Sequence, residues 1–103
     1  MGFTFSSYED GLQIDSFENK QFKSEINVPE QIGDFKVLKI GDDVFSGQSN
    51  LKKITVPSVV NNIGKNAFKG CTGITEFVFP ESLKTIYSYA FQGCTGLTHA
   101  EIP

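Results

Sequence analysis

The sequence predicts a solenoid of stacked turns with short parallel β-strands, and two observations lead to this fold class. The first is a repeat, because segments 40–57, 63–80 and 86–103 follow one pattern at a spacing of 23 residues. A period of this length indicates units that stack on one another. The second is the identity of the recurring residues. Phenylalanine, glycine and proline return at fixed places in the pattern, at Phe45, Phe68 and Phe91, at Gly47, Gly70 and Gly93, and at Pro57, Pro80 and Pro103.

Size and composition favour one soluble domain. A chain of 103 residues can bury a single core, and ten phenylalanines among 39% hydrophobic residues predict an aromatic one. The net charge is −3 and Lys and Arg form no dense run, which argues against nucleic acid as the main partner. No apolar stretch approaches the roughly 20 residues that span a bilayer, so we expect no direct membrane insertion.

The two ends of the chain bear on its processing. The start at Met1-Gly2-Phe3 lacks the basic and then apolar order of a signal peptide. Met1-Gly2 is either the natural start or a start added for expression, and in the second case a natural export signal has been removed. The chain stops at Pro103, part-way through a third 23-residue unit, which we interpret as the end of a fragment.

Residues 1–39 are predicted to form an irregular, β-rich N-terminal cap, which a stack needs to cover its first regular unit. Phe3–Phe5 and Leu12–Ile14 alternate apolar and polar residues around a polar turn that ends in Asp10-Gly11, a pattern typical of a hairpin. The remaining elements expected here are a loop at 18–24, a strand at 25–29, a turn at 31–34 and a strand at 35–40.

Residues 40–103 are predicted to form regular repeats, at 40–62, 63–85 and, in part, 86–103. In the middle repeat, Ile63, Ala67 and Phe68 are spaced as on one helical or 3-10 turn with the aromatic ring turned inward. Gly70 is expected to end this turn, because glycine adopts a positive φ without a steric penalty.

The second half of each repeat is predicted as a strand. In Glu76–Phe79, the two-residue alternation points Phe77 and Phe79 inward. Pro80 closes the strand because proline has no N–H to donate to a ladder. We expect the strands to stack about 4.8 Å apart in parallel. Behind them we expect a spine of stacked rings from Phe45, Phe68 and Phe91.

Residues 63–80 resemble the unit of BspA-like leucine-rich repeats, which runs close to Ile-Gly-x-x-Ala-Phe-x-Gly-Cys-x-x-Leu-x-x-Ile-x-Ile-Pro. The other two units depart from it at few places, among them Val44, Gln48, Tyr87 and Ala100. The resemblance implies a leucine-rich-repeat solenoid in a bacterial surface or secreted protein that binds host, matrix or other cell-surface proteins. It is more specific for the fold than for the function, since one fold serves different partners.

Outward strand positions are what a solenoid offers to a partner, because the inward ones form the core. Alternation places eight such residues in two rows across neighbouring strands, Glu25, Lys53, Glu76 and His99 in the first and Asn27, Thr55, Val78 and Glu101 in the second. The alternative is that the alternating charges only stabilise the sheet, at about 0.2–1 kcal/mol for each cross-strand pair.

No catalytic, metal or cofactor site is predicted. His99 is the single histidine and, with two cysteines, leaves a zinc site short of ligands. Cys71 and Cys94 point the same way from consecutive units, which disfavours a disulfide, so we expect free, buried thiols. Scans for a phosphate loop, a nucleophile elbow and a zinc-protease motif find none, and we therefore expect no enzyme.

Together with this resemblance, the sequence leads us to expect a non-catalytic protein-interaction module of a bacterial cell-surface or secreted repeat protein, acting in adhesion or in binding of host or matrix proteins. The alternative is a structural spacer that presents other domains and has no ligand of its own. A further expectation is self-association at the C-terminal edge, because no following unit covers Phe91 and Ile102 in a chain that ends at Pro103.

Overall fold

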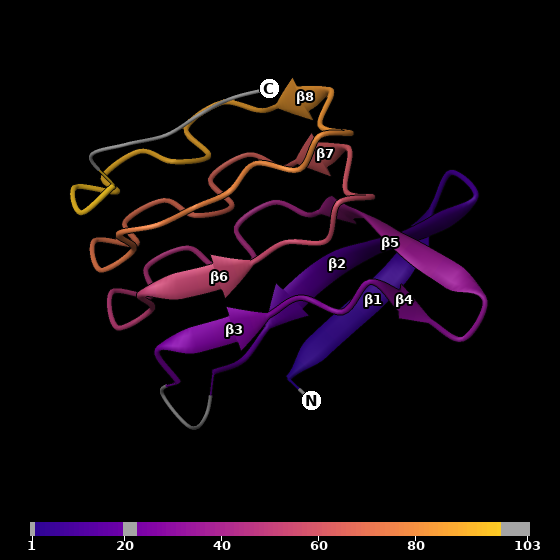
Figure 1. Cartoon of the computed structure of the whole chain (residues 1–103), viewed down its shortest axis with the longest axis horizontal. Coiled ribbons are helices and arrows are strands. Elements are labelled where there is room, and N and C mark those ends of the chain that lie inside the picture. The colour runs from indigo at the N-terminus through magenta and orange to yellow at the C-terminus, as the bar shows by residue number, and fades with distance from the viewer. Residues whose placement is uncertain (1, 20–22, 98–103) are drawn as a thin grey trace.

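A computed structural model describes residues 2–19 and 23–97, in which the chain coils in successive turns that stack along one axis (Figure 1). Within these residues the strands are short and are joined by turns. They are β1 (Phe3–Tyr8), β2 (Gly11–Phe17), β3 (Glu25–Asn27), β4 (Gln31–Ile32), β5 (Phe35–Ile40), β6 (Lys53–Thr55), β7 (Asn62–Ile63) and β8 (Thr85–Ile86).

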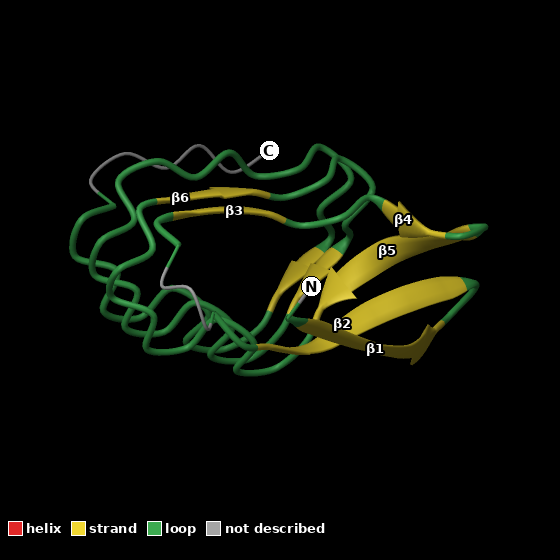
Figure 2. Ribbon diagram, turned by 90° about the horizontal axis from the view of Figure 1, so that it is seen from below, coloured by secondary structure: helices red, strands yellow, loops and turns green. Residues whose placement is uncertain are grey.

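These strands form two sheets. The larger has the order β1-β2-β5-β7-β8, with β4 pairing with β5, and the smaller consists of β3 and β6. The pairs β1–β2 and β4–β5 are antiparallel. The pairs β2–β5, β5–β7 and β7–β8 are parallel and follow one another along the stack. Figure 2 shows the β3–β6 ladder on one side of the coil and β1 and β2 on the other, where β1, β2 and β5 extend beyond the turns as a twisted wing.

A row of isoleucines runs along the inner side of the larger sheet. Ile40 pairs with Ile63, and Ile63 with Ile86, while the Gly41 N–H donates to the Ile14 carbonyl at 2.9 Å and so extends the row to β2. Three of these isoleucines, Ile14, Ile40 and Ile63, are fully buried. The prediction that Ile63 lies on one helical turn with Ala67 and Phe68 is wrong, because the backbone of Ile63 belongs to the parallel ladder in β7.

The aromatic spine is confirmed and is longer than predicted. The rings of Phe45 and Phe68 stack at 5.1 Å with an 8° interplanar angle, and those of Phe68 and Phe91 at 5.2 Å and 9°. Phe17 adds a fourth ring, 5.5 Å from Phe45, and Phe3 lies 4.4 Å from Phe17. Rings from β1 and β2 therefore cover the N-terminal end of the spine. At the other end, Phe91 is only partly buried.

The predicted helical or 3-10 turn is not confirmed, because the described residues contain no helix. In segment 65–70 the Lys69 N–H bonds back to the Asn66 carbonyl, but the Phe68 and Gly70 N–H groups bond forward to the next unit at 2.8 Å. Asn66 also has φ 59°, in the left-handed region that interrupts a right-handed helix. The segment is therefore a chain of tight turns that forms a ladder between units. Gly70, at φ 76°, takes the predicted positive φ.

The strand predicted at Glu76–Phe79 is reduced to one bridge, between Glu76 and Lys53. Phe77 and Phe79 nevertheless point inward as predicted, with 6% and 7% of their surfaces exposed. Their rings lie 4.8 Å apart in a T-shaped arrangement. We attribute the loss of the ladder to the volume of these two rings, because the corresponding inward residues of β3 and β6 are aliphatic.

The N-terminal hairpin is confirmed, with longer strands than the alternation indicated. Residues 6–8, expected in the turn, belong to β1, and the turn itself is Glu9-Asp10, with Glu9 at φ 52°. The strand Phe35–Ile40 is as predicted, and the turn expected at 31–34 is confined to Gly33, with φ 59°, and Asp34, because Gln31 and Ile32 form β4. The strand expected at 25–29 ends at Asn27. In the loop predicted at 18–24, residues 20–22 lie outside the described part, and no helix or strand is present in the rest.

Candidate interaction surface

The smaller ladder positions the side chains that the sequence singled out. Glu25 pairs with Lys53, Ile26 with Ile54 and Asn27 with Thr55, all in parallel, and Lys53 bridges to Glu76. Backbone hydrogen bonds hold this register at both ends, from Lys53 N–H to the Ser24 carbonyl at 3.1 Å and from Val28 N–H to the Thr55 carbonyl at 3.0 Å. The predicted neighbours Glu25, Lys53 and Glu76 therefore lie in consecutive turns.

Inward and outward positions of this ladder differ sharply in burial. Ile26, Ile54 and Phe77 are 6%, 4% and 6% exposed. The residues between them are exposed, namely Glu25, Asn27, Lys53, Thr55 and Glu76, and Val78 is exposed over 82% of its surface. The structure thus brings together six of the eight predicted surface residues. His99 and Glu101 lie outside the described residues.

The charges in this row do not pair with one another. Among residues 2–19 and 23–97, no ion pair joins Lys53 to Glu25 or to Glu76, although the three backbones are neighbours. Exposed cross-strand charges without direct contact contribute little to stability. The three side chains are therefore free to meet charges on a partner.

A second polar cluster, which sequence reasoning missed, lies on the outer side of the larger sheet. The Lys39 ammonium lies 5.3 Å from the centre of the Tyr8 ring and 5.4 Å from that of Tyr87, so the cation contacts both aromatic rings. Asn62 is buried and donates from Nδ2 to the Tyr8 hydroxyl at 2.8 Å. Partial burial and the neighbouring carboxylate of Glu9 raise the pKa of Tyr8.

A sequence signal for this cluster exists at position 87. Regular units carry glycine there, at Gly41 and Gly64, and a side chain at Gly64 would meet the backbone of Gly41 at 2.6 Å. Tyr87 replaces that glycine, and its ring reaches Lys39 in β5, two strands away in the sheet. A departure from the repeat thus marks a contact that the repeat alone does not predict.

Both cysteines are free, as predicted, and each thiol donates to a backbone carbonyl of the preceding unit. Cys71 Sγ lies 2.9 Å from the Phe45 oxygen and Cys94 Sγ 3.0 Å from the Phe68 oxygen. Burial raises the pKa of Cys71 to about 11, and it raises the pKa of Cys94 as well. The prediction that both are buried holds for Cys71 alone, because Cys94 is half-buried in the last turn that the structure describes.

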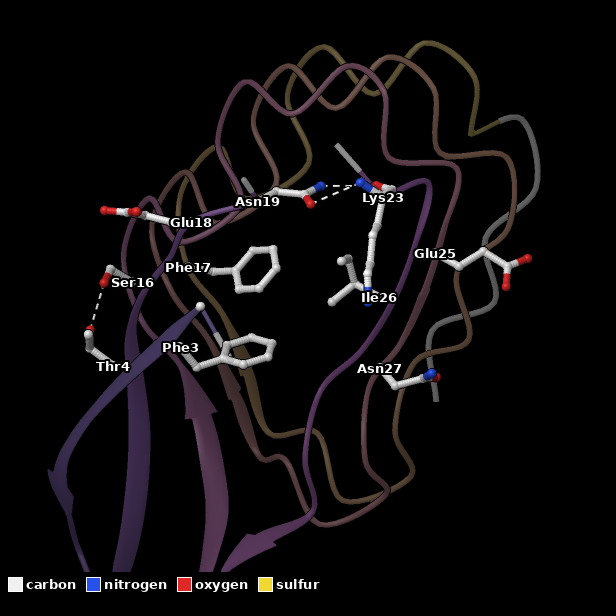
Figure 3. Close-up of a pocket in the computed structure, with 11 residues that line it drawn as sticks. Phe3, Thr4, Ser16, Phe17, Glu18, Asn19, Lys23, Glu25, Ile26 and Asn27 are labelled. Atoms are coloured by element: carbon white, nitrogen blue, oxygen red, sulfur yellow. Dashed lines mark hydrogen bonds between the residues drawn. The ribbon is translucent and has the colours of Figure 1, made fainter. Parts of the chain in front are cut away.

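A hollow of about 710 Å³ lies at the N-terminal end of the coil, between β2 and β3 (Figure 3). Phe3, Phe17 and Ile26 point into it, whereas Glu18 and Glu25 point away. The Asn19 side chain bonds twice to the Lys23 backbone, at 2.9 Å each, which holds these two residues together at the rim. The hollow therefore combines an apolar floor of Phe3, Phe17 and Ile26 with a mostly polar rim, and the carboxylates of Glu18 and Glu25 do not converge on it.

Within the described ranges, no three His, Cys, Asp or Glu side chains are grouped so that they could share a metal ion. The described part of the chain also contains no helix long and apolar enough to cross a membrane.

Stacked turns, parallel ladders on both sides and a continuous aromatic row define a repeat protein. The family model described as the BspA type leucine rich repeat region matches residues 10–103 in 6 copies. The chain belongs to this family. A search of curated proteins finds no match.

Three bacterial proteins of solved structure are similar to this chain. The leucine rich repeat protein of T. pallidum is 28% identical with a TM-score of 0.92, over 99% of this chain and 48% of that one. A leucine rich cell surface protein of Faecalibacterium prausnitzii is 28% identical with a TM-score of 0.84, over 94% of this chain and 28% of that one. A Bacteroides ovatus leucine-rich repeat protein is 24% identical with a TM-score of 0.87, over 100% of this chain and 28% of that one, and at this identity it shows the fold alone. The chain thus spans less than half the length of these relatives.

Proposed function

We propose that the chain is a non-catalytic protein-interaction module of a bacterial surface or secreted protein, and that it binds partner proteins through the outer side of the β3–β6 ladder. The observation that carries this proposal is the row Glu25, Lys53 and Glu76, which is exposed, in register and free of internal ion pairs in the described residues. The β3–β6 pairing and the Lys53–Glu76 bridge hold the backbones of these residues in register, and an ordered pattern of charges gives specificity to protein interfaces.

The neighbouring row adds less polar contacts to the same surface. Asn27 and Thr55 lie beside the charged row, and the exposed side chain of Val78 offers an apolar contact near Glu76. A partner with the reverse order of charges, acidic opposite Lys53 and basic on either side of it, fits this surface. Membership of the family and the cell-surface description of the Faecalibacterium relative support a location outside the cell, where the proposed role is adhesion or matrix binding.

A reversal of the whole row tests the proposal. The triple variant Glu25→Lys, Lys53→Glu and Glu76→Lys keeps opposite charges on neighbouring strands, so it preserves the sheet while inverting the pattern presented to a partner. It shifts the net charge by +2 from −3, and Glu30→Lys, at an exposed position off the ladder, is the matched control. Binding is measured on immobilised collagen and laminin by surface plasmon resonance. We expect saturable binding that the control retains and the triple variant loses by at least about tenfold, as for buried charge pairs.

The second candidate is a structural spacer that has no ligand of its own. The alternation of charge along the row favours it, because Lys53 lies between Glu25 and Glu76 and the opposite charges largely cancel in their attraction for a charged partner. The same experiment separates the two. Saturable binding that depends on the row excludes the spacer, and binding that the triple variant retains excludes the proposed surface.

A further inference from the structure

The outer edge of β1 is an unusual feature of the larger sheet. β1 is the first strand in the order β1-β2-β5-β7-β8 and pairs with β2 on one side only. In Figure 2 it forms the lower border of the wing, and no other labelled strand lies beyond it. An edge strand of this kind presents unpaired N–H and C=O groups to solvent.

The backbone N–H and C=O groups of β1 point alternately toward β2 and toward solvent, so the unpaired ones can be identified. The Glu18 N–H donates to the Gly2 carbonyl at 3.0 Å, so even-numbered residues turn their backbone groups toward β2. The backbone groups of Phe3, Phe5 and Ser7 therefore point outward. Among residues 2–19 and 23–97, no hydrogen bond is made to these outward groups.

The sequence of this edge lacks the devices that usually prevent strand pairing. β1 reads FTFSSY, with six residues, no charge and no proline. The irregularity between Thr4 and Phe5 places its extra residue in β2, not in β1. The free edge of the smaller ladder differs, because β3 has three residues and carries Glu25.

We propose that β1 is a homodimerisation edge, at which the β1 strands of two copies pair in antiparallel fashion about a two-fold axis. The symmetric register places Phe5 opposite Phe5 of the second copy and Phe3 opposite its Ser7, so that every outward backbone group gains a partner. Self-pairing brings the side chains of two identical strands together, and a strand without charged residues does this without repulsion. The absence of charge is therefore the reason to assign the edge to a second copy.

This pairing is independent of the proposed function and leaves its surface open. The β3–β6 ladder lies on the other side of the coil from β1 (Figure 2). A dimer joined at β1 would carry two copies of the Glu25, Lys53 and Glu76 row, and a surface that displays two sites gains avidity without new contacts.

Amide hydrogen exchange measured by NMR at several protein concentrations tests the pairing. We expect the Phe5 and Ser7 amides to exchange fast in dilute protein and to become protected as concentration rises, in step with the dimer fraction from analytical ultracentrifugation. The Ser6 and Tyr8 amides, which face β2, should be protected throughout. Fast exchange of Phe5 and Ser7 at all concentrations, or protection at all concentrations, would overturn the proposal.

Two proline variants locate the contact. Ser7→Pro removes an outward N–H and leaves the bonds to β2 intact, while Asn27→Pro does the same at the free edge of β3. Each dimer would lose two hydrogen bonds on Ser7→Pro, so we expect its dissociation constant to rise about tenfold or more, with no change for Asn27→Pro. A dissociation constant that Ser7→Pro leaves unchanged would assign self-association elsewhere, such as the C-terminal edge.

Discussion

The inward and outward sides of the same turns differ in what determines their residues. Phe45, Phe68 and Phe91 recur because each ring must stack on the ring of the next turn at 5.1–5.2 Å. Lys53 and Glu76 occupy the same place in consecutive turns and have opposite charges. The inner side is thus determined by contacts within the chain, whereas the outer side is free to differ from turn to turn. This difference is why the repeat defines the fold closely and the partner hardly at all.

The largest effect is expected at the centre of the inner side. Phe68 is fully buried, stacks on Phe45 and Phe91, and meets the edge of Phe77 at 5.2 Å. Phe68→Ala removes these contacts and leaves a cavity, so we expect a loss of about 3–5 kcal/mol in the free energy of unfolding. Urea denaturation followed by circular dichroism measures it. Phe91→Ala, at a half-buried ring, serves as the comparison and should cost less, while a loss below about 1 kcal/mol at Phe68 would refute the spine.

The next largest effect is a loss of stability at high pH, and it comes from Cys71, a buried residue on the inner side. The pKa of Cys71 is raised to about 11 in the folded chain from an ordinary value of 9.0. The folded state therefore holds its proton where the unfolded state releases it, so stability is complete below pH 9 and falls as pH rises toward 11. A shift of this size corresponds to about 2–3 kcal/mol. Lysines and tyrosines titrate in the same range, so the quantity to measure is the difference between wild type and Cys71→Ala in unfolding free energy from pH 8 to 11. A constant difference across that range would contradict the burial of this thiol.

A smaller effect is expected where the N-terminal hairpin meets the regular turns. Tyr8→Phe keeps the ring beside Lys39 and removes the hydroxyl that accepts from buried Asn62. We expect a loss of about 0.5–1.5 kcal/mol, the usual value for one hydrogen bond. Tyr89→Phe, at an exposed tyrosine, is the control and should change nothing. Equal effects of the two substitutions in thermal unfolding would show that Tyr8 does not hold the hairpin to β7.

Much of the fold was predictable because equivalent positions in successive repeat units have the same packing environment. The spacing of Phe45, Phe68 and Phe91 predicted the stacked spine, and the alternation at Phe77 and Val78 separated inside from outside correctly. The parallel ladder through Ile40, Ile63 and Ile86 was missed. Apolar residues at Ile63, Ala67 and Phe68 suit a helical turn equally well, because periodicity over so few residues does not distinguish turns from strands.

The rest depended on contacts between turns that no single unit encodes. Asn66 adopts a left-handed conformation that a sequence pattern does not reveal for a residue other than glycine. Tyr8 and Asn62 are 54 residues apart and meet only because the hairpin folds beside β7. For the candidate surface, alternation predicted which residues face outward. The lack of ion pairs between Lys53 and its neighbours could be recognised only from the positions of the side chains in the structure.

The smallest effect is predicted for the outer side, and it tests the division between the two sides most directly. The measurement is the free energy of unfolding, by urea denaturation, of the triple variant that reverses Glu25, Lys53 and Glu76. Because these side chains are exposed and make no ion pairs in the described structure, we expect a value within about 0.5 kcal/mol of wild type. A loss of about 2 kcal/mol or more would show that the row is part of what holds the turns together, and would contradict the account of the outer side as a surface left free for a partner.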